Sequence, residues 1–268
     1  MKNTESVQET EAQSRINSLK RQIVLAASAA GEGHIPSAFS ILDILWVLYN
    51  RVLRINPQNP QWQERDRFIL SKGHGSLALY AVLADKGFFD RSQLDCFAQF
   101  DSPLGGHPDC NKVPGIEAST GSLGHGLPMG IGMALGMRIR KIERRVIVLV
   151  GDGECNEGSI WESALIAAHH KLSNLTCIVD YNHSTDRALM LGDLKAKFEA
   201  FGWAAVRIDG HNHDTIHNTL SRAQSDRPLA IVAETVKGHG CKRMENNPAW
   251  HHMAPTQDEL ASIIEELT

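Results

Sequence analysis

An aspartate and an asparagine, each following an apolar run, are the residues best placed to do chemistry. Asp152 follows residues 146–150 in a Gly-Asp-Gly turn, and Asn182 follows residues 175–181. The two are about 30 residues apart, the length of a strand–helix–strand unit. In a parallel unit both side chains lie at the carboxyl edge of the sheet, where open α/β sheets bind ligands. A carboxylate and an amide oxygen beside flexible glycines suit a hard cation that holds a diphosphate.

The glycines around Asp152 fit other sites poorly. A dinucleotide site needs G-x-G-x-x-G at the start of a helix, and here the third glycine is displaced to Gly158. The sequence contains no G-x-x-x-x-G-K-[ST] phosphate loop. A plain turn therefore stays open as the alternative to a Mg²⁺ or Ca²⁺ site with a diphosphate.

Four histidine segments lie in predicted loops beside glycine or proline. They contain His34, His74, His107 and the pair His251-His252. Imidazoles can donate hydrogen bonds to phosphate oxygens or transfer protons near neutral pH. One loop histidine is usually a solvated surface residue, so it is the number of similar segments that favours a shared site. The spacing of zinc ligands is absent. We interpret the remaining histidines of the second half as structural: His169, His170, His211, His213 and His217.

Length and composition suit one large globular domain. The chain has 268 residues, 42% of them hydrophobic, and no composition break marks a linker. We predict a single domain over residues 1–268, with residues 1–12 flexible. A net charge of −4 and a pI near 6.3 leave no nucleic-acid footprint. The sequence also lacks a membrane-length apolar stretch and a signal-peptide core. Five scattered cysteines predict reduced thiols and a cytoplasmic location.

Strand and helix patterns alternate along the chain. We expect strands at residues 67–70, 146–150, 175–181, 204–208 and 229–235. We expect helices at residues 14–30, 37–53 with Ser37 as the N-cap, 77–85, 90–97, 157–171, 194–201, 214–225 and 258–267. The nearly continuous apolar strands are typical of a parallel sheet that is buried on both faces. The fold class is therefore α/β, a mostly parallel central sheet with helices on both faces.

Two features leave a choice between internal packing and a subunit contact. Glycines recur through residues 121–137, where we expect a loop leading into a buried helix with a small-residue face. Such a face can pack within the domain or against a second subunit. Glu157 and Glu162 lie five residues apart on the helix after the Gly-Asp-Gly turn. They fit a helix-start carboxylate plus a surface residue, or a buried carboxylate network at a subunit contact.

Taken together, these segments resemble the transketolase family. The likeness is carried by Gly151-Asp152-Gly153-Glu154, Glu157-Gly158, Trp161-Glu162, Asp180-Tyr181-Asn182, Gly33-His34, Ser71-Lys72-Gly73-His74, Gly106-His107-Pro108, residues 120–126, Thr235-Val236-Lys237-Gly238 and residues 244–252. These motifs follow the family's order over most of the chain. Residues 121–126, with His125, are most similar to the separately encoded N-terminal subunit of a split transketolase. The resemblance implies a thiamine-diphosphate-binding fold.

The resemblance also implies residue roles. Mg²⁺, with Ca²⁺ or Mn²⁺ as the expected substitutes, would be bound by Asp152, the Asn182 side chain and the Ser184 carbonyl. Cofactor contacts are implied for His74, Gly121, Ser122, Leu123, Gly153, Glu157, Asn182 and His252, with residues 121–123 near the aminopyrimidine. The residues His34, His107 and His252 would line the substrate channel and assist proton transfers. With Glu162, Glu157 would join a carboxylate network that links two active sites.

Two segments depart from the family pattern. After Asn182 the family usually runs Asn-x-x-Gln-x-Asp-Gly, whereas residues 183–188 here contain no glycine. The Ser184 assignment therefore rests on less than those of Asp152 and Asn182. Met253 stands where the family has glycine, and this change is expected to reshape the channel mouth.

The implied activity is transfer of a two-carbon ketol unit from a ketose to an aldose, the reaction of a transketolase-type transferase. In the family, the carboxylate that activates the aminopyrimidine lies in a second, pyrimidine-binding domain. A full transketolase-like chain is more than twice this length. We infer that a separate C-terminal transketolase subunit supplies that domain, in an α₂β₂ assembly.

Two alternatives stay open. One is the α subunit of another thiamine-diphosphate enzyme, such as a 2-oxo acid dehydrogenase, and the histidine segments argue against it. The other is a non-catalytic half-transketolase that acts as a binding module. The sequence does not name the sugar or its head group, whether phosphate, sulfonate or another.

Overall fold

Five parallel strands form the sheet of the computed structural model, in the order β1-β2-β3-β5-β4. Its strands are β1 (Arg67–Leu70), β2 (Val146–Gly151), β3 (Leu175–Tyr181), β4 (Ala204–Asp209) and β5 (Leu229–Glu234). The structure describes residues 2–186, 188–222 and 226–267, with side chains from residue 11 onward. All four neighbouring pairs run parallel. The predicted α/β class and parallel sheet are confirmed.

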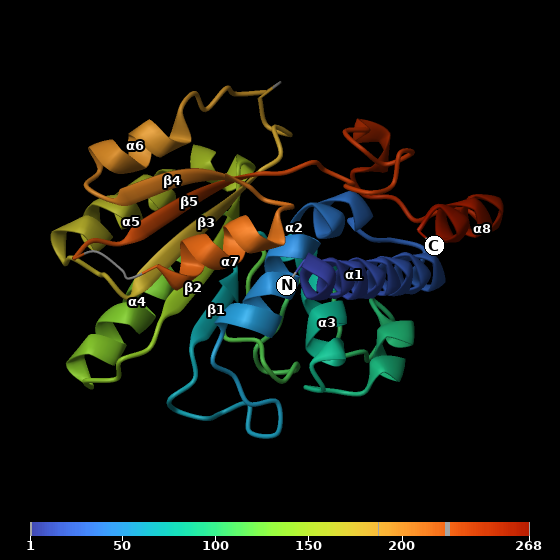
Figure 1. Ribbon diagram of the computed structural model, residues 1–268, viewed down its shortest axis with the longest axis horizontal. Helices are drawn as coiled ribbons and strands as arrows, with labels where there is room; N and C mark the ends of the chain where they lie inside the picture. Colours follow the sequence, from blue (N-terminus) through green and yellow to red (C-terminus); the bar gives the residue numbers. More distant parts are fainter. Residues whose placement is uncertain (1, 187, 223–225, 268) are drawn as a thin grey trace.

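Helices cover both faces of the sheet (Figure 1). The α-helices are α1 (Lys2–Ala30), α2 (Ile35–Val47), α3 (Ser76–Asp85), α4 (Gly126–Ile139), α5 (Gly158–His169), α6 (Leu194–Ala200), α7 (His213–Ser221) and α8 (Gln257–Glu266). A π-helix (Leu48–Val52) extends α2, and short 3-10 helices lie at Gly73–Gly75, Arg91–Cys96, Gly153–Asn156 and Pro248–Trp250. One face carries α1, α2, α3, α7 and α8, and the other carries α4, α5 and α6.

Alternation along β2 divides the hydrophobic core into two layers. Ile147 and Leu149 pack with α1, α2 and α3, whereas Val146, Val148 and Val150 pack with α4, α5 and α6. All six residues of β2 are buried, because side chains of a strand point alternately to its two faces and both faces are covered. This arrangement explains why the strand reads as a continuous apolar run. It also holds the carboxyl end of β2 at a fixed place in the fold.

The predicted strands agree with the structure to within one residue at each end, and the helix ends agree less well. Ser37 was expected to cap the second helix, which is wrong, because α2 begins at Ile35 after His34. Pro36 in the first turn has its φ preset for a helix, so the start needs no side-chain cap. The first helix begins at Lys2, well before the predicted residue 14, since its polar beginning carries no apolar period. The flexibility of residues 1–12 stays a prediction, and Met1 and residues 223–225 lie outside the described residues.

The glycines of α4 have two environments. A Cβ on Gly130 would lie 2.5 Å from a Val148 methyl group, so this glycine lets the helix pack closely on β2. Gly132 and Gly136 have open space where a Cβ would be. The helix is therefore buried on one side only, and the small-residue face serves internal packing in part. The open side leaves the predicted subunit contact untested.

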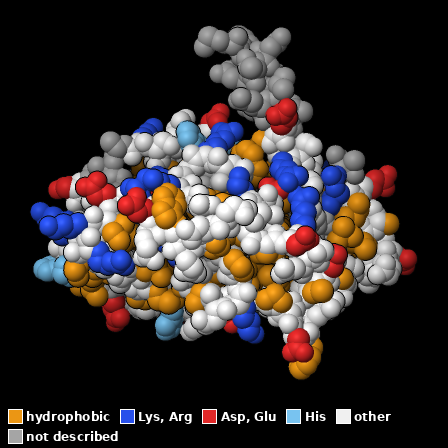
Figure 2. Space-filling model, turned by 90° about the horizontal axis from the view of Figure 1, so that it is seen from below, with side chains coloured by type: hydrophobic (Ala, Val, Ile, Leu, Met, Phe, Trp, Pro, Cys, Tyr) orange, Lys and Arg blue, Asp and Glu red, His pale blue; other side chains and the backbone are white. Residues whose placement is uncertain are grey.

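The surface has mixed charge. Figure 2 shows acidic and basic side chains interspersed over the face seen from below, with hydrophobic side chains between them. Within the described ranges, none of the helices has the length and apolar character that crossing a membrane would require. All five cysteines are free.

Candidate functional site

Four strand ends bring the predicted site residues to one edge of the sheet. The segment from Ser71 to His74 follows β1, Asp152 follows β2, Asn182 follows β3 and Lys237 comes shortly after β5. Gly151 pairs with Asp180 in the β2–β3 register, so Asp152 and Asn182 leave adjacent strands at nearly the same level. The sheet edge expected from the sequence is therefore formed, and it collects side chains that lie far apart in the chain.

The two carboxylate oxygens of Asp152 have different surroundings. Its Oδ1 accepts hydrogen bonds from the Gly153 nitrogen at 2.8 Å and from Ser184 Oγ at 3.3 Å. Its Oδ2 is buried and has no hydrogen-bond partner among the described residues. Burial and the neighbouring charge of Asp180 raise the pKa of Asp152. A buried carboxylate oxygen that lacks a donor is a place where a cation would be favourable.

Asn182 is oriented by a buried polar network. Its Nδ2 donates to Asp180 Oδ2 at 2.9 Å, which leaves its Oδ1 as the acceptor group, and the Ser184 nitrogen donates to that oxygen at 3.1 Å. Ser184 therefore contacts both Asp152 and Asn182. A carboxylate, an amide oxygen and a nearby main-chain carbonyl form the hard oxygen donor set that Mg²⁺ prefers. These residues fit the implied metal.

Asp180 is held by four donors from four segments. The Lys72 ammonium, Ser40 Oγ at 2.9 Å and Asn182 Nδ2 donate to its Oδ2, while Thr235 Oγ1 donates to its Oδ1. Burial alone would raise the pKa of Asp180, but the Lys72 charge and these hydrogen bonds outweigh burial and lower it. Asp180 therefore stays ionised and fixes the Asn182 amide.

The predicted loop histidines form one cluster. The ring centre of His34 lies 5.4 Å from that of His74, 4.4 Å from His252 and 5.6 Å from His251. Burial and the neighbouring imidazoles lower the pKa of His34 to about 4. Burial and Lys72 lower the pKa of His74 even further. Both rings are therefore neutral at pH 7, and each can donate one hydrogen bond and accept another.

The loop at residues 121–123 and His107 meet this cluster at Gly73. A Cβ on Gly73 would lie 3.0 Å from the Gly121 nitrogen and 3.0 Å from His107 Cδ2. Only a glycine permits this approach, which joins the loop after β1 to the loop before α4. Ser122 and Leu123 are exposed beside this contact, and Gly153 is partly exposed, with open space where a Cβ would be. These positions are accessible to a ligand at the sheet edge.

Lys237 and His251 belong to the site but were not among the predicted site residues. The Lys237 ammonium lies 3.1 Å from His251 Nδ1. Burial and the Lys72 charge lower the pKa of Lys237, and the carboxylates of Asp152 and Asp180 oppose that shift. The ammonium therefore lies within electrostatic reach of the candidate metal ligands. The signal that could have identified it is its position shortly after β5, at the same sheet edge.

Glu157 and Glu162 are both exposed on the surface. Glu157 is the N-cap residue of α5, and a Cβ on Gly124 would lie 2.7 Å from Glu157 Cβ. Within the described part of the chain, neither carboxylate makes a hydrogen bond or ion pair. Glu157 therefore contacts the loop before α4, and the predicted network between two active sites stays a prediction that needs a second subunit.

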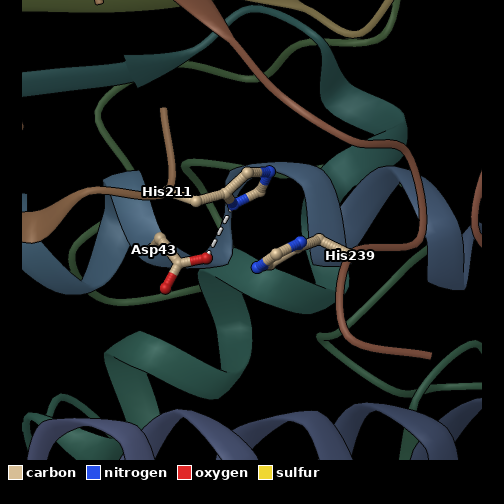
Figure 3. A group of neighbouring side chains, drawn as sticks. All are labelled: Asp43, His211 and His239. Atoms are coloured by element: carbon tan, nitrogen blue, oxygen red, sulfur yellow. Dashed lines mark hydrogen bonds and ion pairs between the residues drawn. The ribbon is translucent and has the colours of Figure 1, made fainter. Parts of the chain in front are cut away.

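A second histidine cluster, outside this edge, is structural as predicted. Asp43 accepts from His211 Nδ1 at 2.9 Å and from His213 Nε2 at 2.8 Å, and these bonds hold the pKa of its buried carboxyl low (Figure 3). His211 Nε2 accepts from the Val236 nitrogen at 2.9 Å, so both its ring nitrogens are occupied. The His239 ring stacks on His211 at 3.6 Å and 20°. Lone pairs in nearly parallel planes cannot converge on one ion at about 2 Å, so the cluster is not a metal site.

The sequence and structure comparisons identify a family. The family model described as "Transketolase, thiamine diphosphate binding domain" matches residues 11–268. One of the two subunits of an apulose-4-phosphate transketolase from Phocaeicola vulgatus is 37% identical over 98% of this chain and 95% of that protein. A 6-deoxy-6-sulfo-D-fructose transketolase subunit of a Clostridium species is 37% identical over 98% of both chains.

Solved transketolase structures share the fold. The Campylobacter jejuni transketolase superimposes with a TM-score of 0.88 at 30% identity, over 95% of this chain and 42% of that one. A Pichia stipitis transketolase in complex with sedoheptulose 7-phosphate gives 0.88 at 28% identity, over 96% and 40%. The chain thus spans about two fifths of the length of these transketolases.

Proposed function

This chain belongs to the transketolase family, and we propose that it is the diphosphate-binding subunit of a two-chain transketolase. The complex transfers a two-carbon ketol unit from a ketose to an aldose. Thiamine diphosphate, when bound, supplies the carbon nucleophile and the electron sink for this transfer. The observation that carries the proposal is the buried Oδ2 of Asp152, which lacks a partner among the described residues, at the sheet edge that also gathers the imidazole cluster.

The metal and the diphosphate divide the site between them. Asp152, the Asn182 amide oxygen and the Ser184 carbonyl hold Mg²⁺, with Ca²⁺ or Mn²⁺ as substitutes. His74, the Gly153 amide and Lys237 donate to diphosphate oxygens, because each offers an N–H at the edge where the metal sits. This division suits the charges, since a cation and a lysine offset the carboxylates and the diphosphate.

The neutral imidazoles serve the sugar. His34, whose pKa is near 4, is unprotonated at pH 7 and can accept a proton from a sugar hydroxyl. His252 lies 4.4 Å from His34, ring centre to ring centre, and can pass a proton within the cluster. His107 and His251 extend the same lining. The chain thereby orients the sugar and moves its protons.

The partner subunit supplies the pyrimidine-binding domain. The relatives named as transketolase subunits are matched over 95 to 98% of their own length, which supports a division into two chains. We propose an α₂β₂ assembly, in which Glu157 and Glu162 face a second subunit. The cytoplasmic location stays a prediction.

The test is reconstitution. The purified chain is assayed for ketol transfer with thiamine diphosphate and Mg²⁺, alone and with the pyrimidine-binding subunit. We expect activity only from the complex. Full activity of the lone chain contradicts the two-chain arrangement, and inactivity with the partner and all donors favours a non-catalytic binding module.

The sugar carries a terminal anionic group in this proposal. The two relatives named above act, by name, on a sugar phosphate and on a sulfonated ketose. A screen of matched ketose donors with phosphate, sulfonate or hydroxyl at the far end distinguishes these head groups. Turnover of 2-oxo acids instead of ketoses supports the dehydrogenase alternative.

A further inference from the structure

Glu154 is a buried carboxylate that the proposed reaction does not use. It is 1% exposed, and in the described part of the chain no lysine, arginine or histidine forms an ion pair with it. Its oxygens accept three hydrogen bonds instead. Oε1 accepts from Ser71 Oγ at 2.6 Å and from the Gly124 nitrogen at 2.9 Å, and Oε2 accepts from the Gly151 nitrogen at 2.9 Å.

The three donors belong to three different segments of the site. Ser71 follows β1, Gly124 lies in the loop before α4, and Gly151 ends β2. Ser71 Oγ also accepts from the Gly126 nitrogen at 3.1 Å, so the loop is bonded at two points. Gly124 has a left-handed φ of +76°, which turns its N–H toward the carboxylate. Glu154 therefore ties the loop that carries residues 121–123 to two strand ends.

A carboxylate suits this position better than a neutral side chain. It is an acceptor only, and its two oxygens can serve three donors. Hydrogen bonds to an ionised acceptor are roughly twice as strong as neutral ones. A glutamine of the same shape has one acceptor oxygen, and its NH₂ group would face either the Gly124 or the Gly151 N–H. One backbone donor would then stay buried and unpaired.

We propose that Glu154 is a positioning residue that holds residues 121–123 where they meet the cofactor. It touches neither metal nor substrate and acts through the Gly124 amide and Ser71. The inference rests on the proposed function only for the identity of the ligand that residues 121–123 contact.

The test compares Glu154→Gln with Glu143→Gln, which removes an exposed carboxylate near the start of β2. Hydrogen–deuterium exchange is measured on the full chain without cofactor, and thiamine diphosphate affinity is measured on the assembled complex with Mg²⁺. We expect Glu154→Gln to speed exchange in the peptide covering residues 121–126 by roughly tenfold or more, with α1 and β4 unchanged. Cofactor affinity should fall by roughly tenfold, and Glu143→Gln should change neither.

Several results would overturn the inference. Unchanged exchange at residues 121–126 does so, and so does faster exchange with unchanged cofactor affinity and turnover, which indicates a structural role alone. If Glu154→Gln does not fold, Ser71→Ala replaces it, and unchanged exchange in that variant is equally decisive. A wild-type complex that fails to bind thiamine diphosphate refutes the proposed function instead, and the exchange data still decide whether Glu154 holds the loop.

Discussion

Asp152 and Asp180 lie on neighbouring strands, yet their carboxylates are in opposite states. The Asp152 nitrogen donates to the Asp180 carbonyl oxygen at 3.1 Å, so the two backbones are in direct contact. Asp180 receives four hydrogen-bond donors, whereas Asp152 Oδ2 is buried and receives none from the described residues. The protein satisfies one carboxylate with its own groups and leaves the other for a ligand. This asymmetry separates the supporting aspartate from the binding one.

Replacing Asp152 with alanine should abolish Mg²⁺-dependent cofactor binding. The change removes the only carboxylate among the proposed metal ligands, so we expect the affinity for thiamine diphosphate to fall by about 100-fold or more. Calorimetric titration of the assembled complex, with and without Mg²⁺, measures this. Asp95→Ala, at an exposed position, is the control. Affinity equal to that of the control would remove Asp152 from the metal site.

Replacing Lys72 with methionine should destabilise the fold. Lys72 and Asp180 are 1% and 0% exposed, so the change leaves a buried carboxylate without its counter-charge, at a cost of about 3–5 kcal/mol. Urea unfolding of the single variant measures the loss. The double variant Lys72→Met with Asp180→Asn should recover part of it. A double variant no more stable than Lys72→Met would contradict the charge-pair account.

Stability should fall as the pH decreases from 6.5 toward 4. The folded-state pKa of His34 is about 4, below the ordinary value of about 6.5, so between these values the unfolded chain binds more protons. Stability is therefore complete above pH 6.5 and is lost as the pH falls. His239, whose burial lowers its pKa to about 4, adds to the same trend. Urea midpoints of wild type and His34→Gln at pH 7.0, 5.5 and 4.5 should show a weaker pH dependence in the variant. Equal slopes would mean that His34 is not the neutral group assigned here.

His183 should matter for metal affinity more than for stability. Its Nδ1 lies 2.8 Å from Asp186 and its Nε2 lies 2.9 Å from Glu234, so it fastens the loop after Asn182 to the end of β5. Since the ring is half exposed, His183→Ala should lower the unfolding free energy by about 1 kcal/mol or less. The released loop should weaken Mn²⁺ binding by roughly tenfold. Calorimetry with Mn²⁺ tests this against His169→Ala, and equal affinities would show that His183 does not hold the metal loop.

The sheet and the metal–diphosphate pair were predictable because their signals are local. Each buried strand is a continuous apolar run, and the residue after a parallel strand must lie at the carboxyl edge. Asp152 and Asn182 could therefore be placed from spacing alone. The start of α1 could not, because its first residues are polar and lack the period that marks a buried helix face.

Which polar groups complete the site was decided by the tertiary structure. Nothing in the spacing of Lys72, Glu154 and Lys237 indicates that the first neutralises Asp180, the second joins three segments and the third lies within electrostatic reach of Asp152. Hydrogen bonds and charge pairs between distant segments depend on where the folded backbone places each donor, and no local pattern encodes that. The sequence by itself determined the fold, the family resemblance and the metal-binding pair. Only the folded chain decided which aspartate was left open for a ligand.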